Sequence, residues 1–207
     1  MDNTPSALNN AQYLIVYPVT STVIRDAIVD AMRQAKLYIP PHMYTKVYFE
    51  KNFHVTLCPP FYTSHELATR LNLGLAVQDL SCNSNDFYLG NLAFFENQST
   101  DTLHFEVKCP ERILKHVHRI RNGLKGDTDI CFAGNSNSEG VKLHITVAEG
   151  KDLAKLPELA HWVNQYNTER NTAEADHRPR RFGQLVSCLF IKHQGGWKHL
   201  TSEPERV

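Results

Sequence analysis

The chain has 207 residues, and its 22 basic residues balance its 22 acidic ones, so it carries no formal net charge. With 42% hydrophobic residues, it is long and apolar enough to bury a core, as one domain or as two similar halves. Its neutral charge argues against non-specific attraction of long nucleic acid, so we expect no long duplex as a partner.

The first half of the chain predicts two strands, each followed by a helix. Residues 12–19 (QYLIVYPV) are rich in β-branched and aromatic residues, and apolar residues at helical spacing follow them. A second strand carries residues 52–57 (NFHVTL), and we expect the following CPPF to terminate it. Thr63 and Glu66 have the spacing of a capping box, which predicts a helix over 64–73.

The second half predicts further strands and helices and a polar stretch near its end. The clearest helix covers 110–124, because Ile113, Val117 and Leu124 repeat along one face. Residues 168–182 are polar and include HRPRR, and we expect them to be a mobile loop. The remaining expected elements are strands over 85–97, 101–109 and 141–149, a helix over 153–168 and a closing hairpin over 184–200.

The order of these elements is β-α-β-α-β-β-α-β-α-β-β, which lacks the regular βαβ rhythm of a doubly wound sheet. We therefore expect an α+β fold with antiparallel sheets and helices on the outside. Residues 1–11 are expected to form a flexible N-terminus, and residues 12–207 a single domain whose two halves each carry one His-x-Thr strand.

Two of the expected strands, one in each half, share a polar pattern. In an extended strand, residues i and i+2 lie on the same face. His54 and Thr56 therefore share one face of their strand, and apolar neighbours occupy the other. His144 and Thr146 repeat the arrangement within KLHITV.

A single His-x-Thr in a strand is usually structural, with a histidine at an edge and a threonine chosen for its β propensity. Both copies here have the pattern apolar-His-apolar-Thr-apolar, and both place polar groups in strands that otherwise look buried. The repetition therefore favours a functional interpretation.

Two histidines and two hydroxyls that converge on one site are suited to phosphodiester chemistry. Histidine titrates near neutral pH, so one ring can accept a proton from the attacking oxygen and the other can protonate the leaving oxygen. The threonine hydroxyls can bind non-bridging phosphate oxygens. We therefore expect His54, Thr56, His144 and Thr146 to be catalytic, with no metal and no cofactor.

The paired HVT and HIT strands resemble the two signatures of the 2H (two-histidine) phosphoesterase superfamily. The superfamily includes LigT-like RNA and cyclic nucleotide phosphodiesterases and viral or phage enzymes that cleave 2′,5′- or cyclic oligonucleotides. The first strand and helix, the segment between the signatures and the closing hairpin are also similar. The resemblance implies a bilobal fold with pseudo-twofold symmetry around a central cleft, and metal-independent hydrolysis by the four residues.

The resemblance leaves the bond that is cleaved open between a 2′,3′-cyclic phosphate, a 2′-5′ linkage and a cyclic oligonucleotide linkage. A viral or phage counter-defence role would suit such an enzyme. The alternative is a binding module that holds a nucleotide in the same cleft without cleaving it, as a sensor or scaffold. The intact histidines in both signatures favour the enzyme.

Five other residues are candidates for substrate binding. An arginine guanidinium can bind phosphate through two parallel N–H groups, and an aromatic ring can stack on a base. A short basic run is nevertheless more often only solvated, and core packing is the commoner fate of an aromatic residue. The candidates are Arg178, Arg180 and Arg181 for phosphate, and Trp197 and Tyr48 for a base.

The remaining features bear on location and partners. The five cysteines are scattered and show no metal-binding or disulfide spacing, which is typical of a reducing compartment. No secretory signal and no apolar run of membrane-spanning length is present in the sequence given. We expect a cytoplasmic monomer that binds a small nucleotide or oligonucleotide and no membrane.

Overall fold

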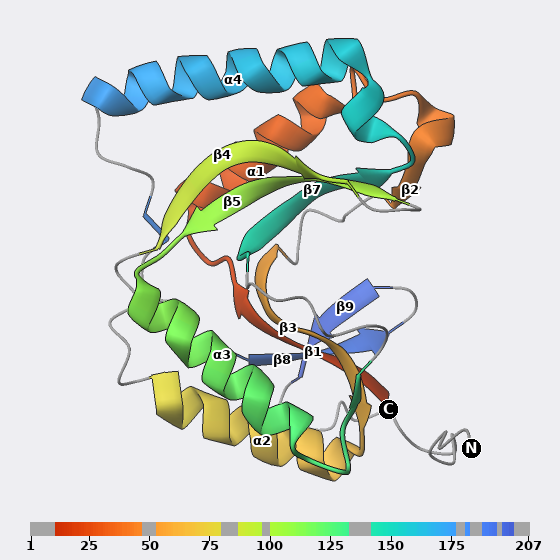
Figure 1. The fold of residues 1–207 in the computed structure, drawn as a ribbon, viewed down its shortest axis with the longest axis vertical. Coiled ribbons are helices and arrows are strands. Elements are labelled where there is room, and N and C mark those ends of the chain that lie inside the picture. Colours follow the sequence, from red (N-terminus) through yellow and green to blue (C-terminus); the bar gives the residue numbers. More distant parts are fainter. Residues whose placement is uncertain are drawn as a thin grey trace.

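The computed structural model describes residues 11–46, 53–79, 87–96, 100–132, 142–176, 181–182, 188–193 and 196–200. These residues form two antiparallel sheets with the strand orders β6-β3-β1-β8-β9 and β2-β7-β5-β4, and the helices lie outside them (Figure 1). The expected α+β class with antiparallel sheets and outer helices is confirmed. The strands are β1 (Ala11–Pro18), β2 (Tyr44–Lys46), β3 (His54–Thr63), β4 (Tyr88–Phe95), β5 (Asp101–Lys108), β6 (Cys131–Phe132), β7 (His144–Gly150), β8 (Cys188–His193) and β9 (Gly196–His199). The helices are α1 (Thr22–Ala35), α2 (His65–Asp79), α3 (Glu111–Lys125) and α4 (Pro157–Asp176), with short 3₁₀ turns at Pro41–Met43 and Leu153–Lys155.

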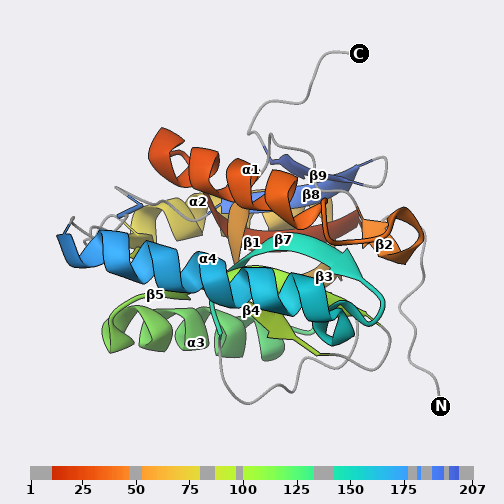
Figure 2. The ribbon, with the colours of Figure 1, turned by 90° about the horizontal axis from the view of Figure 1, so that it is seen from above.

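Two helices cover each sheet. One helix of each pair follows, in the chain, a strand that belongs to the other sheet. Helix α1 follows β1 but packs on β7, and α3 follows β5 but packs on β3. Helices α2 and α4 pack on β8 and β4, in the sheets from which they come. Figure 2 shows α1 and α4 over the same sheet, where Trp162 Nε1 of α4 donates a hydrogen bond to Gln34 Oε1 of α1 (3.0 Å). The crossing helices tie the two sheets together.

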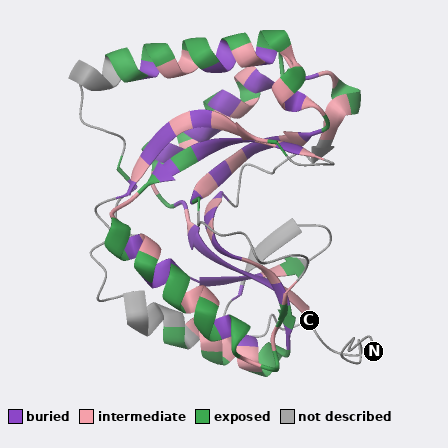
Figure 3. Ribbon diagram, in the orientation of Figure 1, coloured by how far each residue is buried: buried purple, intermediate pink, exposed green. Residues whose placement is uncertain are grey.

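The helix-facing sides of both sheets form one large apolar core. In β3 and β7 the apolar residues Val55, Leu57, Ile145 and Val147 are almost fully buried, as their alternation predicted. Figure 3 shows the same division on α1 and α3, which are exposed on their outer sides and buried toward the strands. The opposite side of the five-stranded sheet carries a second, smaller apolar cluster, formed by Leu14, Val16, Cys188 and Phe190.

The expectation that CPPF terminates the second strand is wrong, because β3 continues through it to Thr63. The pairing with β1 is irregular at this point. Between the pairs made by Tyr13 and Ile15, β1 contributes only Leu14, whereas β3 contributes Pro59 and Pro60. This bulge accommodates two residues that have no N–H to donate, so the strand continues past Pro59 and Pro60.

The expected capping box at Thr63 is also wrong. The Thr63 hydroxyl donates a hydrogen bond to the Asp129 carbonyl (3.0 Å), and Ser64 Oγ accepts one from the Leu67 amide (3.2 Å). Ser64 is therefore the N-cap residue of α2, because its side chain accepts a hydrogen bond from a first-turn N–H three residues later. The helix also extends beyond the expected 64–73, to Asp79.

The polar stretch 168–182 is not a loop throughout, because α4 continues to Asp176. Arg170 accounts for part of this order. It is only 6% exposed, donates hydrogen bonds to the carbonyls of Leu89 and Gly90, and places its guanidinium over the Phe105 ring (5.6 Å to the centroid). A charged side chain buried against these partners holds the helix on β4 and β5.

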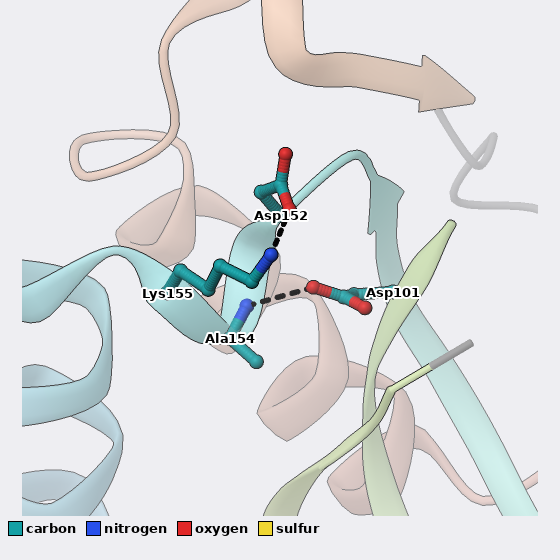
Figure 4. Close-up of polar contacts among 4 residues, drawn as sticks. All are labelled: Asp101, Asp152, Ala154 and Lys155. Atoms are coloured by element: carbon teal, nitrogen blue, oxygen red, sulfur yellow. Dashed lines mark hydrogen bonds and ion pairs between the residues drawn. The ribbon is translucent and has the colours of Figure 1, made fainter. Parts of the chain in front are cut away.

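A tight turn after β7 fixes that strand against the beginning of β5 (Figure 4). Gly150 pairs with Asp101, and Asp152 then adopts a left-handed conformation (φ 54°) that reverses the chain. The Asp101 carboxylate accepts a hydrogen bond from the Ala154 amide (3.1 Å), and Lys155 pairs with Asp152 (2.7 Å). The end of β7 is thereby held at a defined register.

Two short strands, β2 and β6, were not expected from the sequence, because segments of two or three residues carry no periodic signal. They pair with β7 and β3, respectively. The closing hairpin is confirmed by the pairing of β8 with β9. Residues 1–10 lie outside the described residues, Ala11 belongs to β1, and the single domain over 12–207 stays a prediction. None of the described helices is long and apolar enough to cross a membrane.

Candidate active site

The structure brings the two His-x-Thr strands together, although they belong to different sheets. Strands β3 and β7 contact each other, and Figure 1 shows both strands beginning where the two sheets meet. His54, Thr56, His144 and Thr146 are all half-buried, whereas the residues between them are buried on the helix-facing sides. The four candidate catalytic side chains therefore lie on the faces that the sheets turn away from their helices.

All four positions are held by pairing within the sheets. His54 and Thr56 are opposite Pro18 and Val16 of β1, which lies in the middle of its sheet. His144 and Thr146 are opposite Glu106 and His104 of β5, an interior strand of the other sheet. Positions on paired strands are held more rigidly than positions on loops, which suits residues that must act together.

The His144 ring has a defined orientation. Its Nδ1 donates a hydrogen bond to the Lys142 carbonyl (3.0 Å), which leaves Nε2 as the atom that can accept or carry a proton at the site. Burial lowers the pKa of His144 below its usual value, and the charge of Arg121 lowers it further. The bond to Lys142 and the charge of Glu149 act in the opposite direction. The neutral ring is therefore favoured at neutral pH.

An aromatic group packs against His144 from the same sheet. His104 of β5 is buried, stacks on Phe95 (3.7 Å between ring centroids) and meets His144 edge to face (5.3 Å). Phe95 also meets His144 edge to face (4.9 Å). Burial lowers the pKa of His104 to about 4, despite its hydrogen bond to the Thr102 carbonyl, so this ring is uncharged at neutral pH. These rings exclude water from one side of His144.

His54 has a different environment. Its ring meets Phe190 of β8 edge to face (5.2 Å), and Phe190 belongs to the small apolar cluster on this side of the five-stranded sheet. The two histidines of the pair are thus not equivalent. His54 lies against a phenylalanine, whereas His144 lies against a neutral imidazole and a phenylalanine, and the charge of an arginine lowers its pKa.

Arg121 of α3 is a basic residue of the site that the sequence analysis missed. Its Nε donates a hydrogen bond to the Leu57 carbonyl (2.6 Å), next to Thr56, and its charge acts on His144. A signal was present, because Arg121 lies four residues after Val117 and three before Leu124, on the apolar face of the helix. His104 also had a signal, because Thr102, His104 and Glu106 alternate with apolar residues in the β5 sequence TLHFEVK.

Of the five residues expected to bind substrate, the structure describes Arg181 and the backbone of Trp197, so their role in binding stays a prediction. Tyr48, Arg178 and Arg180 lie outside the described residues. Arg181 forms a bridge with Tyr88 and places its guanidinium over that ring (5.4 Å to the centroid), at the edge strand β4, with β5 between it and β7. The backbone of Trp197 belongs to the edge strand β9, with β8 and β1 between it and β3.

Two further observations concern the motif and metals. The chain contains a third His-x-Thr, at His199 and Thr201, but Lys198 and Ser202 flank it instead of apolar residues, and Thr201 lies outside the described residues. Within the described part of the chain, no group of three His, Cys, Asp or Glu side chains is arranged to hold a metal ion.

No family model and no curated protein matches the chain. Among solved structures, it is similar to Usb1 of Kluyveromyces marxianus, with 18% sequence identity and a TM-score of 0.42. A structure of the same protein with uridine monophosphate gives a TM-score of 0.43 at the same identity. Both matches cover 93% of this chain and 98% of the Usb1 chain.

Proposed function

We propose that the chain is a phosphodiesterase that uses His54 and His144 as its acid and base. The observation that carries this proposal is the contact between β3 and β7, which brings together two strands with the same half-buried His-x-Thr pair. A purely structural surface has no need of the same imidazole and hydroxyl pair on both strands. Membership of the 2H superfamily is part of this proposal.

His144 acts as the general base in this mechanism. Its Nδ1–H is engaged by the Lys142 carbonyl and its lowered pKa favours the neutral ring, so the Nε2 lone pair can take a proton. The proton comes from the attacking oxygen, either water or a ribose hydroxyl. The attacking oxygen then forms its bond to phosphorus.

His54 then acts as the general acid on the opposite side of the phosphate. As the bond from phosphorus to the leaving oxygen breaks, a protonated His54 transfers its proton to that oxygen. Thr56 and Thr146 donate hydrogen bonds to the non-bridging oxygens, where negative charge accumulates in the transition state. After one turnover the two imidazoles have exchanged protonation states, and exchange with water restores them.

The proposed substrate is a small nucleotide or oligonucleotide with a 2′,3′-cyclic phosphate, a 2′-5′ linkage or a cyclic linkage. A small ligand suits a chain with no net charge, which lacks the field that long nucleic acid requires. The proposed enzyme acts as a monomer in the cytoplasm. The viral or phage counter-defence role stays a prediction.

The test is product analysis by chromatography, with EDTA present, over a panel of substrates. The panel contains a 2′,3′-cyclic mononucleotide, 2′-5′ oligoadenylate, and cyclic di- and trinucleotides. Wild type is compared with His54→Ala, His144→Ala and a matched control, His118→Ala, which removes an exposed imidazole from α3. We expect one class to be cleaved by wild type and the control, and turnover to fall by at least about a hundredfold in each site variant.

Undiminished turnover in folded His54→Ala or His144→Ala would refute the mechanism. No cleavage of any substrate, with nucleotide binding still detectable by calorimetry, would instead support the alternative of a non-catalytic binding module. The two outcomes are distinguished by measuring binding and turnover on the same protein preparation.

A further inference from the structure

Arg121 is anchored at the strand that carries the first His-x-Thr pair of the proposed site. It projects from the apolar face of α3, is half-buried, and donates its Nε–H to the Leu57 carbonyl (2.6 Å). Leu57 immediately follows Thr56, so this hydrogen bond holds the guanidinium at the strand that carries the first His-x-Thr pair. The charge of the same guanidinium also lowers the pKa of His144, which belongs to the other sheet.

The positive charge of Arg121 has no acidic partner among the residues that the structure describes. The thiolate of Cys58 could offset it, but burial raises the pKa of Cys58 to about 12, so this thiol is neutral at physiological pH. Burial also lowers the pKa of Arg121, which reflects the cost of withdrawing its charge from water. A partly buried cation held by one neutral carbonyl is an expensive arrangement unless an anion completes it.

We propose that Arg121 binds the phosphate that is presented to His54 and His144. This inference rests on the proposed function and adds a residue that the His-x-Thr pattern does not contain. With Nε engaged by the Leu57 carbonyl, the two Nη atoms of the planar guanidinium supply N–H groups to a non-bridging phosphate oxygen. A fixed cation at this place would bind the ground state and stabilise the additional charge of the transition state.

The same position gives Arg121 a second effect, on the protonation of His144. Several charged or titratable groups surround that ring. These are His104 and Glu106 of the neighbouring strand β5, Lys142 and Glu149 on its own segment, and Arg121 from α3. The Arg121 charge disfavours the imidazolium, so it helps to keep His144 ready to accept a proton. A bound phosphate offsets that charge, and protonation of His144 then becomes easier.

The simpler interpretation is that Arg121 only satisfies the Leu57 carbonyl and fills space beside β3. A structural residue of that kind would change stability when replaced but would change neither phosphate affinity nor the titration of His144. The experiment therefore uses those two readouts. Two variants are needed, Arg121→Gln and Arg121→Met, because Met retains the apolar stem if Gln destabilises the fold.

The measurement is NMR titration of the histidine rings with pH and with inorganic phosphate as the probe. The matched control is Arg119→Gln, which removes an exposed arginine from the same helix. We expect both Arg121 variants to bind phosphate at least about tenfold more weakly than wild type and to raise the pKa of His144. Wild type and Arg119→Gln should agree with each other in both readouts.

Unchanged phosphate affinity and an unchanged His144 titration in either folded Arg121 variant would overturn the inference. An equal loss in Arg119→Gln would also overturn it, because the effect would then be one of net charge. The proposed function fails separately. Turnover that requires both histidines but not Arg121 would support the phosphodiesterase and refute the role of Arg121. Phosphate binding that depends on Arg121, without turnover of any substrate, would support the role of Arg121 and refute the phosphodiesterase.

Discussion

The buried His104 ring should make the stability of the fold depend on pH. Its pKa is lowered from 6.5 to about 4 in the folded chain, mainly by burial, and returns to its ordinary value on unfolding. As the pH falls through 6.5, His104 therefore binds a proton in the unfolded chain but not in the folded chain. Stability is lost as the pH falls from 6.5 toward 4, and the full loss is about 3 kcal/mol. About 2 kcal/mol of it should be lost between pH 7 and pH 5.

Urea unfolding at pH 7 and at pH 5 measures this loss, in wild type and in His104→Phe. A phenylalanine can keep the stacking on Phe95 but cannot bind a proton. Between the two pH values, wild type should lose about 2 kcal/mol more than His104→Phe. His144, whose pKa is also lowered, titrates in both proteins and largely cancels from the comparison. His118→Phe, at an exposed position of α3, controls for the removal of one imidazole.

An equal pH dependence in wild type and His104→Phe would refute this reasoning. It would mean that the His104 ring gains protons in the folded chain as readily as in the unfolded one. The aromatic group beside His144 would then not exclude water as described.

Three further predictions concern the site and its support. Thr146→Val should lower turnover about tenfold to a thousandfold, as loss of one transition-state hydrogen bond does, with unfolding little changed; equal kinetics would argue against the role of the hydroxyl. Gly150→Ala should destabilise the fold by about 1–3 kcal/mol or more, because an added Cβ would lie 2.3 Å from the Met43 carbonyl oxygen; chemical denaturation measures this, and a stable variant would contradict the packing. Asn167→Ala should cost about 2 kcal/mol in the same assay, because the Asn167 amide exchanges hydrogen bonds of 2.8 and 2.9 Å with the backbone of Leu92; a neutral result would show that α4 does not depend on them.

Local patterns predicted the elements of the fold better than their ends. The alternation around His54 and His144 predicted two half-buried strands, and both were found, because side-chain direction in a strand depends only on position. The ends depended on contacts that are distant in sequence. Two prolines did not end β3 because a bulge against β1 absorbs them, and α4 ran on to Asp176 with Arg170 held by carbonyls of β4.

The sequence by itself determined that the chain has two strands with one polar face each, and that both carry the same pair of groups. This much follows from local geometry, since the period of a strand places i and i+2 together whatever the rest of the chain does. Which strands meet is a question of tertiary packing. The contact between β3 and β7, the aromatic rings around His144 and the approach of Arg121 to the Leu57 carbonyl join residues far apart in the chain. Only the tertiary structure decided them, because no local preference encodes which distant surfaces exclude water together.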